Sequence, residues 1–132
     1  MDEMLEAAIK GWRNASAPYS NFRVGAALRG TGESGQQIIF SGCNVENATY
    51  GLTVCAERVA LFKAISEGAR NFTEILIYTE ATEVTPPCGA CRQLLWEYAG
   101  DIPVTSRNSS GASKTWKLRD LLPEAFGPNN LQ

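Results

Sequence analysis

The chain has 132 residues, 44% of them hydrophobic and 20% charged, which is typical of a globular protein, and we expect a single domain spanning residues 1–132. Its net charge of −2 offers no basic surface for a polyanion, so nucleic acid is not an expected partner. No apolar stretch follows a basic N-terminal segment, and no window approaches the roughly 20 apolar residues of a membrane-spanning helix, so we expect a cytoplasmic protein without membrane contact.

The first third of the chain predicts a helix followed by a strand pair. Apolar residues recur at three- and four-residue intervals after Asp2, which indicates an amphipathic helix that stops near Pro18. Residues 23–29 and 36–43 are apolar stretches on either side of a short connection rich in Gly and Ser. Two such stretches around a turn signal predict an antiparallel hairpin.

The middle of the chain predicts a turn, a helix and a strand. Residues 44–51 are polar and turn-like, and Thr53 is the expected N-cap of a helix that carries Cys55 in its first turn and stops at Gly68. Residues 74–79 contain a compact apolar run, as in a buried strand.

The last third predicts another helix and two short strands. A pair of prolines introduces the helix 88–98, because proline is tolerated in a first turn. Strands are expected at 102–106 and 114–118, then a short helix, and the tail 121–132 is irregular. Helices alternating with strands imply a sheet covered on both faces, with the two later helices side by side.

Three of the four cysteines form a pattern typical of metal ligands, in a chain that contains no histidine. Cys88 and Cys91 are three residues apart, which places both sulfurs on one face of one helical turn, and Cys55 lies on the preceding helix. Unpaired N–H groups and the positive dipole end at each helix start favour thiolates. The pattern predicts a zinc ion held by three thiolates, with a fourth position open for water.

Two charged residues next to Cys55 complete this pattern. Zinc with three thiolates carries a formal charge of about −1, so we expect Arg58, one turn from Cys55, to donate hydrogen bonds to the ligand sulfurs. Glu57 is a hard oxygen donor beside soft sulfurs, better suited to moving protons between water and substrate than to binding zinc.

Two other interpretations of the cysteines are weighed against a catalytic site. A Cys-x-x-Cys run also occurs in redox motifs and structural zinc sites. The redox interpretation leaves Cys55 unexplained, and a structural zinc site needs a fourth ligand, for which Cys43 is the candidate. Cys43 ends an apolar strand, so we expect a buried, inert thiol there. The combination of Cys-Ala-Glu-Arg with Pro-Cys-x-x-Cys, each opening a predicted helix, favours the catalytic site.

Beyond these residues, nearly the whole chain resembles the zinc-dependent nucleoside deaminases, and among them the small homotetrameric cytidine deaminases. The segments that carry the resemblance are PYSNF at 18–22, VGAAL at 24–28, GCNVENA at 42–48, CAER at 55–58, PCGACRQ at 87–93 and LLP at 121–123. The resemblance implies a three-layer α/β/α fold with a mixed five-stranded sheet.

The resemblance also implies the reaction, which is hydrolysis of cytidine and 2′-deoxycytidine to the uridine products and ammonia, in pyrimidine salvage. Cys55, Cys88 and Cys91 match the zinc ligands of the family. Glu57 matches the acid–base residue that takes a proton from zinc-bound water and delivers it to N3 and then to the leaving amine. The cofactor implied is Zn²⁺.

Five matched positions concern the nucleoside. Asn44 and Glu46 match a pair that hydrogen-bonds the ribose 3′-hydroxyl, and Phe22 matches an aromatic residue that packs on the nucleoside. The Ala56 N–H is expected to meet the pyrimidine O2, and the Pro86 carbonyl to accept from the exocyclic amine.

Two aromatic residues imply shared active sites in a homotetramer. Phe126 resembles an aromatic residue contributed to a neighbouring subunit's site, as does Tyr50, although packing in a core or interface is the alternative for both and for Phe22. Two departures from the family pattern are visible, because Pro86 stands where serine is usual and Arg23 where proline is usual. Proline keeps its carbonyl, so the contact to the amine survives the first departure.

Three other functions are weighed against cytidine deamination. Blasticidin-type deaminases share the zinc chemistry, but a carboxylate at Glu46 suits a nucleoside hydroxyl. Polynucleotide deaminases need a groove for flanking nucleotides and positive charge around it, which this composition does not favour. A purely structural zinc protein would bind the metal without hydrolysis.

Overall fold

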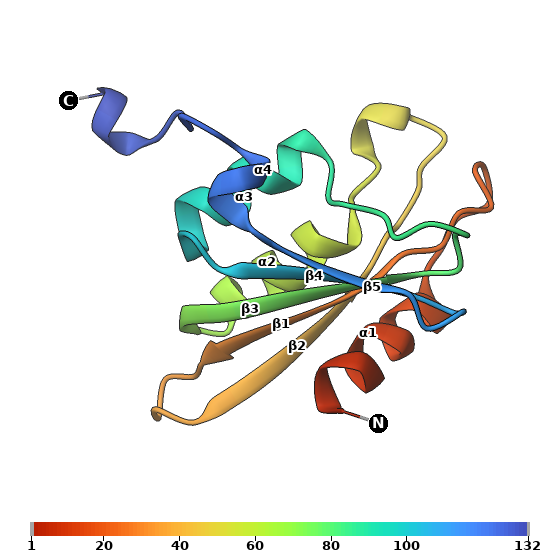
Figure 1. The fold of residues 1–132 in the computed structure, drawn as a ribbon, viewed down its shortest axis with the longest axis horizontal. Helices are drawn as coiled ribbons and strands as arrows, with labels where there is room; N and C mark the ends of the chain where they lie inside the picture. The colour runs from red at the N-terminus through yellow and green to blue at the C-terminus, as the bar shows by residue number, and fades with distance from the viewer. Residues whose placement is uncertain (1, 132) are drawn as a thin grey trace.

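The computed structural model describes residues 2–131, so Met1 and Gln132, the ends of the expected domain and tail, lie outside the described residues. Five strands form one sheet in the order β2-β1-β3-β4-β5 (Figure 1). The helices and strands are α1 (Glu3–Asn14), β1 (Gly25–Thr31), β2 (Gln37–Cys43), α2 (Ala56–Ser66), β3 (Arg70–Thr79), α3 (Gly89–Ala99), β4 (Pro103–Asn108), β5 (Ser113–Lys117) and α4 (Leu118–Leu121), with short 3₁₀ turns at Tyr50–Leu52 and Pro128–Leu131.

The sheet is mixed and has helices on both faces, which confirms the expected three-layer α/β/α fold. Strands β3 and β4 are parallel, and the other neighbours are antiparallel. Alternate residues of β3 explain the two layers, because Ile75 and Ile77 pack under α2 and α3 whereas Leu76 and Tyr78 pack under α1. Figure 1 shows α1 on one side of the sheet and α2 and α3 on the other.

The predicted hairpin is confirmed. Strands β1 and β2 pair from Gly25 opposite Cys43 to Thr31 opposite Gln37, and the connection turns at Gly35, whose φ of 82° suits a residue without a side chain. This register places Cys43 and the polar segment that follows it at the same end of the sheet as the start of β1.

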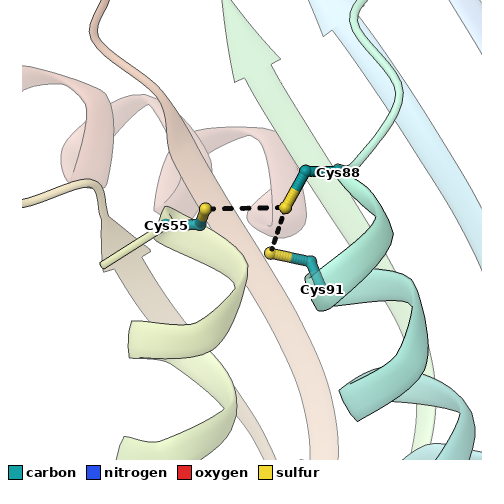
Figure 2. A group of neighbouring side chains, drawn as sticks. All are labelled: Cys55, Cys88 and Cys91. Carbon is teal, nitrogen blue, oxygen red and sulfur yellow. Dashed lines mark hydrogen bonds between the residues drawn. The ribbon is translucent and has the colours of Figure 1, made fainter. Parts of the chain in front are cut away.

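The parallel pair explains why α2 and α3 start near each other. Parallel neighbours require a crossover, and α3 forms the crossover between β3 and β4. Helix α2, which precedes β3, packs on the same face of the sheet as α3. The N-termini of the two helices therefore lie close together (Figure 2). The predicted side-by-side arrangement is therefore confirmed.

The predicted start of α2 was wrong. Thr53 does not cap the helix, and Cys55 is itself the N-cap instead of lying in the first turn. The reason is a two-way bridge between Val45 and Val54, whose N–H and C=O groups bond each other at 3.0 Å and keep the chain extended up to Cys55. Likewise Cys88 is the N-cap of α3.

The far end of the chain is more regular than expected. The tail contains the 3₁₀ turn Pro128–Leu131, in which the Asn130 side chain accepts a hydrogen bond from the Gly127 N–H at 2.8 Å. Among residues 2–131, no helix has both the length and the apolar character needed to cross a membrane.

Candidate metal centre and adjoining cavity

Three sulfur atoms converge where α2 and α3 begin. Figure 2 shows the Cys55, Cys88 and Cys91 side chains pointing toward one another from the two helices. The sulfur of Cys88 lies 3.8 Å from that of Cys55 and 3.4 Å from that of Cys91, and all three atoms lie within 4.8 Å of one another. Cys55 and Cys88 occupy N-cap positions, and Cys91 follows one turn later.

This geometry fits a zinc ion. Tetrahedral zinc with bonds of about 2.3 Å to sulfur separates its ligand atoms by about 3.8 Å, close to the spacing in this cluster. Within residues 2–131 the cluster contains only these three metal-ligating side chains, and Cys43 is not among them. The centre therefore has the three protein ligands of an open zinc site, and the four-cysteine structural alternative finds no support.

Hydrogen bonds and burial distinguish the sulfurs. The pKa of Cys55 is lowered to about 5, first because the Cys91 thiol donates to it, with Arg58 adding to the effect. The same hydrogen bond, together with burial, raises the pKa of Cys91. One Nη of Arg58 donates to the Cys55 sulfur at 3.7 Å and to the Thr53 carbonyl at 3.1 Å. Cys43, expected to be a buried thiol, is only half-buried, and burial raises the pKa of its thiol.

Glu57, the second residue of α2, is buried next to this cluster. Only 5% of its surface is exposed, and burial, followed by the negative charge of Cys55, raises the pKa of its carboxyl to about 7. A carboxyl with a pKa near neutrality can both accept and release a proton under ordinary conditions.

A cavity of about 280 Å³ lies against the metal centre and exposes most of the predicted site residues to one space. Its lining residues are Ser20, Phe22, Val24, Asn44, Glu46, Thr53, Val54, Cys55, Ala56, Glu57, Ile77, Thr85, Pro86 and Cys88. Cys91 and Arg58 are not lining residues, but each contacts a sulfur that does line the cavity: Cys91 that of Cys88, and Arg58 that of Cys55.

Two polar residues of the cavity are held by the loop before β1. The Asn44 amide accepts from the Val24 N–H at 2.9 Å and donates to the Phe22 carbonyl at 2.8 Å. One oxygen of Glu46 accepts from the Tyr19 and Ser20 N–H groups at 2.9 and 3.0 Å, and the other accepts from the Ser20 hydroxyl. The Ser20 hydrogen bonds lower the pKa of Glu46.

Tyr50 and Phe126 do not reach the cavity of their own chain. Tyr50 is 76% exposed and lies edge-on to Tyr19, with 6.3 Å between ring centroids, in a neighbouring hollow of about 340 Å³. Phe126 is 57% exposed on the tail that projects from the fold in Figure 1, where its carbonyl accepts from the Gln93 side chain at 2.8 Å.

Sequence reasoning gave no role to three residues that the structure places at the site. Ser20 and Thr85 line the cavity, and the Thr85 N–H donates to the Ser106 hydroxyl at 3.1 Å. Arg92 donates from Nε to the Pro87 carbonyl at 2.7 Å and from Nη1 to the Leu121 carbonyl at 2.9 Å. Only the position of Ser20 and Arg92 inside the quoted motifs could have indicated them.

The chain is similar to known proteins in both sequence and structure. Residues 1–104 match the family model described as the cytidine and deoxycytidylate deaminase zinc-binding region. A cytidine deaminase of Halalkalibacterium halodurans is 44% identical over 93% of this chain and 91% of its own length, and one of Sporosarcina psychrophila is 39% identical over 99% and 94%. The crystal structure of cytidine deaminase from Burkholderia pseudomallei superposes with a TM-score of 0.84 at 44% identity, covering 96% of this chain and 100% of that one.

Proposed function

Because the chain belongs to the family defined by the cytidine and deoxycytidylate deaminase zinc-binding region, we propose that it hydrolyses cytidine and 2′-deoxycytidine to uridine and 2′-deoxyuridine and releases ammonia. It is a hydrolase with a zinc-binding centre at Cys55, Cys88 and Cys91. The observation that carries the proposal is the buried Glu57 carboxyl, which lines the same cavity as two of the three sulfurs. The products suit a role in pyrimidine salvage.

Glu57 performs the proton transfers in this proposal. When bound, zinc supplies a water molecule whose pKa falls from about 15.7 toward 7. Glu57 would take one proton from that water and deliver it to N3 of the pyrimidine ring while the water oxygen bonds to C4. It would then take the second proton of the same oxygen and pass it to the amine, which leaves as ammonia as the C4–N bond breaks and the C4 carbonyl forms. The raised pKa supports both roles, because a carboxyl that titrates near 7 gives up a proton as readily as it takes one.

The other cavity residues orient the nucleoside. The Ala56 N–H opens α2, where the first N–H groups of a helix have no intrahelical partner, and is assigned to the pyrimidine O2. The Pro86 carbonyl accepts from the exocyclic amine, and the Phe22 ring packs on the nucleoside. Asn44 and Glu46 bind the ribose 3′-hydroxyl. A cavity of about 280 Å³ supports a small-molecule substrate in preference to a polymer.

We further propose one catalytic domain that assembles as a homotetramer with shared active sites. The exposure of Tyr50 and Phe126 supports this, because aromatic side chains are enriched at protein interfaces. The free thiols, which must stay reduced to hold zinc, support a place in the cytoplasm.

Substituting Glu57 tests the reaction. In Glu57→Gln we expect bound zinc and the thermal midpoint to be retained while turnover of cytidine falls by at least about 10³-fold, since the amide keeps the shape but can neither accept nor release a proton near neutral pH. Turnover is followed by the loss of cytidine ultraviolet absorbance, and zinc by metal analysis of the purified protein. Glu67→Gln, at the other end of α2, is the matched control and keeps wild-type activity. Activity near wild type in Glu57→Gln contradicts the mechanism.

A further inference from the structure

Ser20 lies at the junction of the two hollows beside the metal centre. It lines both the cavity that contains Glu57 and the neighbouring hollow that contains Tyr50. The loop that carries it turns tightly, because Asn21 has a φ of 58° and its N–H donates to the Ala17 carbonyl at 3.0 Å. The Ser20 hydroxyl therefore has a fixed backbone beneath it.

The Glu46 carboxylate has an almost complete set of hydrogen bonds. An ionised carboxylate offers about four lone-pair positions. The Tyr19 and Ser20 N–H groups occupy both positions of Oε1, and the Ser20 hydroxyl occupies one position of Oε2. One acceptor position remains, on Oε2, and Glu46 is a lining residue of the cavity.

The same hydroxyl also orders the aromatic residue of the cavity. Its oxygen accepts from the Phe22 N–H at 3.0 Å while its proton goes to Glu46. On the other side of Phe22, the carbonyl accepts from the Asn44 amide. Ser20 thus links the carboxylate to the backbone that carries the Phe22 ring.

We propose that Ser20 is a positioning residue, whose hydroxyl holds the Glu46 carboxylate so that it accepts a single hydroxyl of the sugar. This inference rests on the proposed function and deepens it. Because one acceptor position is left, Glu46 cannot accept hydrogen bonds from both hydroxyls of a ribose. It accepts one from the 3′-hydroxyl alone. Glu46 therefore strengthens the binding of cytidine and of 2′-deoxycytidine equally. It does not strengthen the binding of a nucleoside that lacks the 3′-hydroxyl.

The test compares three substrates in Ser20→Ala and Glu46→Ala. Ser20→Ala is expected to raise KM for cytidine and for 2′-deoxycytidine by about tenfold each, with kcat within about twofold, because the lost contact involves a charged group. KM for 2′,3′-dideoxycytidine is expected to rise by no more than about twofold, because this substrate loses only the support of the Phe22 backbone. The variant with both substitutions is expected to have a KM for cytidine within about twofold of that of Glu46→Ala, because Ser20 acts mainly through Glu46.

Two further variants separate this role from a general loss of structure. Ser20→Thr keeps a hydroxyl and is expected to restore KM for cytidine to within about threefold of wild type. Ser66→Ala removes a surface hydroxyl of α2 that bonds only the Lys63 carbonyl, and it leaves all three KM values unchanged. Zinc content is measured in each variant.

The outcomes that overturn the inference differ from those that overturn the proposed function. If wild type deaminates cytidine and Glu46→Ala raises KM but Ser20→Ala does not, the inference alone is wrong. An equal KM increase for 2′,3′-dideoxycytidine in Ser20→Ala also refutes it. If wild type deaminates none of the three nucleosides, both fall together.

Discussion

Gly42 lies where β2 passes beneath the start of α2, and the space there is too small for any side chain. A Cβ atom at this position would lie 2.4 Å from the Ala56 carbonyl oxygen and 2.6 Å from the Ala60 nitrogen. Both neighbours are backbone atoms of α2, so the strain could be relieved only by moving the helix. Ala56 follows Cys55 directly, and the close contact therefore fixes the height of a zinc ligand above the sheet.

Gly42→Ala is accordingly expected to weaken both the fold and the metal centre. Overpacking of this kind costs about 1–3 kcal/mol of unfolding free energy, and displacement of Cys55 lowers zinc affinity as well. Urea unfolding measures the first effect and competition with a chelator the second. Gly127→Ala is the control, because nothing lies within 4 Å of a Cβ atom there. Unchanged zinc affinity in Gly42→Ala would show that α2 does not set the position of Cys55.

The first turn of α3 connects the zinc ligands with the C-terminal tail. The Arg92 guanidinium bonds the carbonyl of Pro87, which directly precedes Cys88, and the carbonyl of Leu121 at the end of α4. The next residue, Gln93, bonds the Phe126 carbonyl further along the tail. The start of α3 thus carries two metal ligands, and its side chains also hold the C-terminal tail through the carbonyls of Leu121 and Phe126.

Arg92→Ala is expected to lower the unfolding free energy by about 2 kcal/mol, because two part-buried carbonyls lose a charged donor. Gln93→Ala, which removes one exposed neutral bond, is the matched comparison and costs about 0.5–1 kcal/mol. Chemical unfolding of both variants with zinc bound gives the values. A loss in Arg92→Ala no larger than in Gln93→Ala would mean that the guanidinium contributes nothing beyond an ordinary surface contact.

The elements show which parts of the structure local sequence could predict. The hairpin, the buried strand β3 and the helix α3 follow from apolar runs and turn residues, and the three-residue spacing of Cys88 and Cys91 places their sulfurs together. The start of α2 could not be predicted, because it depends on a bridge between Val45 and Val54.

The chemistry of the site depended in the same way on contacts between distant segments. The raised pKa of Glu57 results from burial beneath packed elements, and the role of Ser20 results from hydrogen bonds that join residues 26 positions apart. No local pattern encodes either of them. The zinc ligands, by contrast, were visible because two of the three share one helical turn.

The assembled protein should reveal whether Phe126 acts on its own cavity or on a neighbour's. Static light scattering is expected to give four times the mass of one chain. Phe126→Ala is expected to raise KM for cytidine without loss of zinc, because the side chain is far more exposed than a core residue and does not line its own chain's cavity.

Mixed assemblies make this prediction decisive. Glu57→Gln subunits are inactive but carry an intact Phe126, whereas Phe126→Ala subunits keep Glu57. Co-expression of the two is expected to restore a low KM for cytidine in part of the sites, since each variant supplies what the other lacks. A monomeric mass, or no recovery on co-expression, would show that no such exchange takes place between subunits.

Strands β2 and β5 are the two edge strands of the sheet, and lysine side chains lie at both edges. The Lys63 ammonium donates to the Ser41 carbonyl of β2, while β5 carries Lys114, stacked on Trp116, and Lys117. Positive charge along an edge discourages a second sheet from adding to the ladder. If copies of this chain assemble, we expect them to meet through helices and loops and not through the sheet edges, which would limit the size of the assembly.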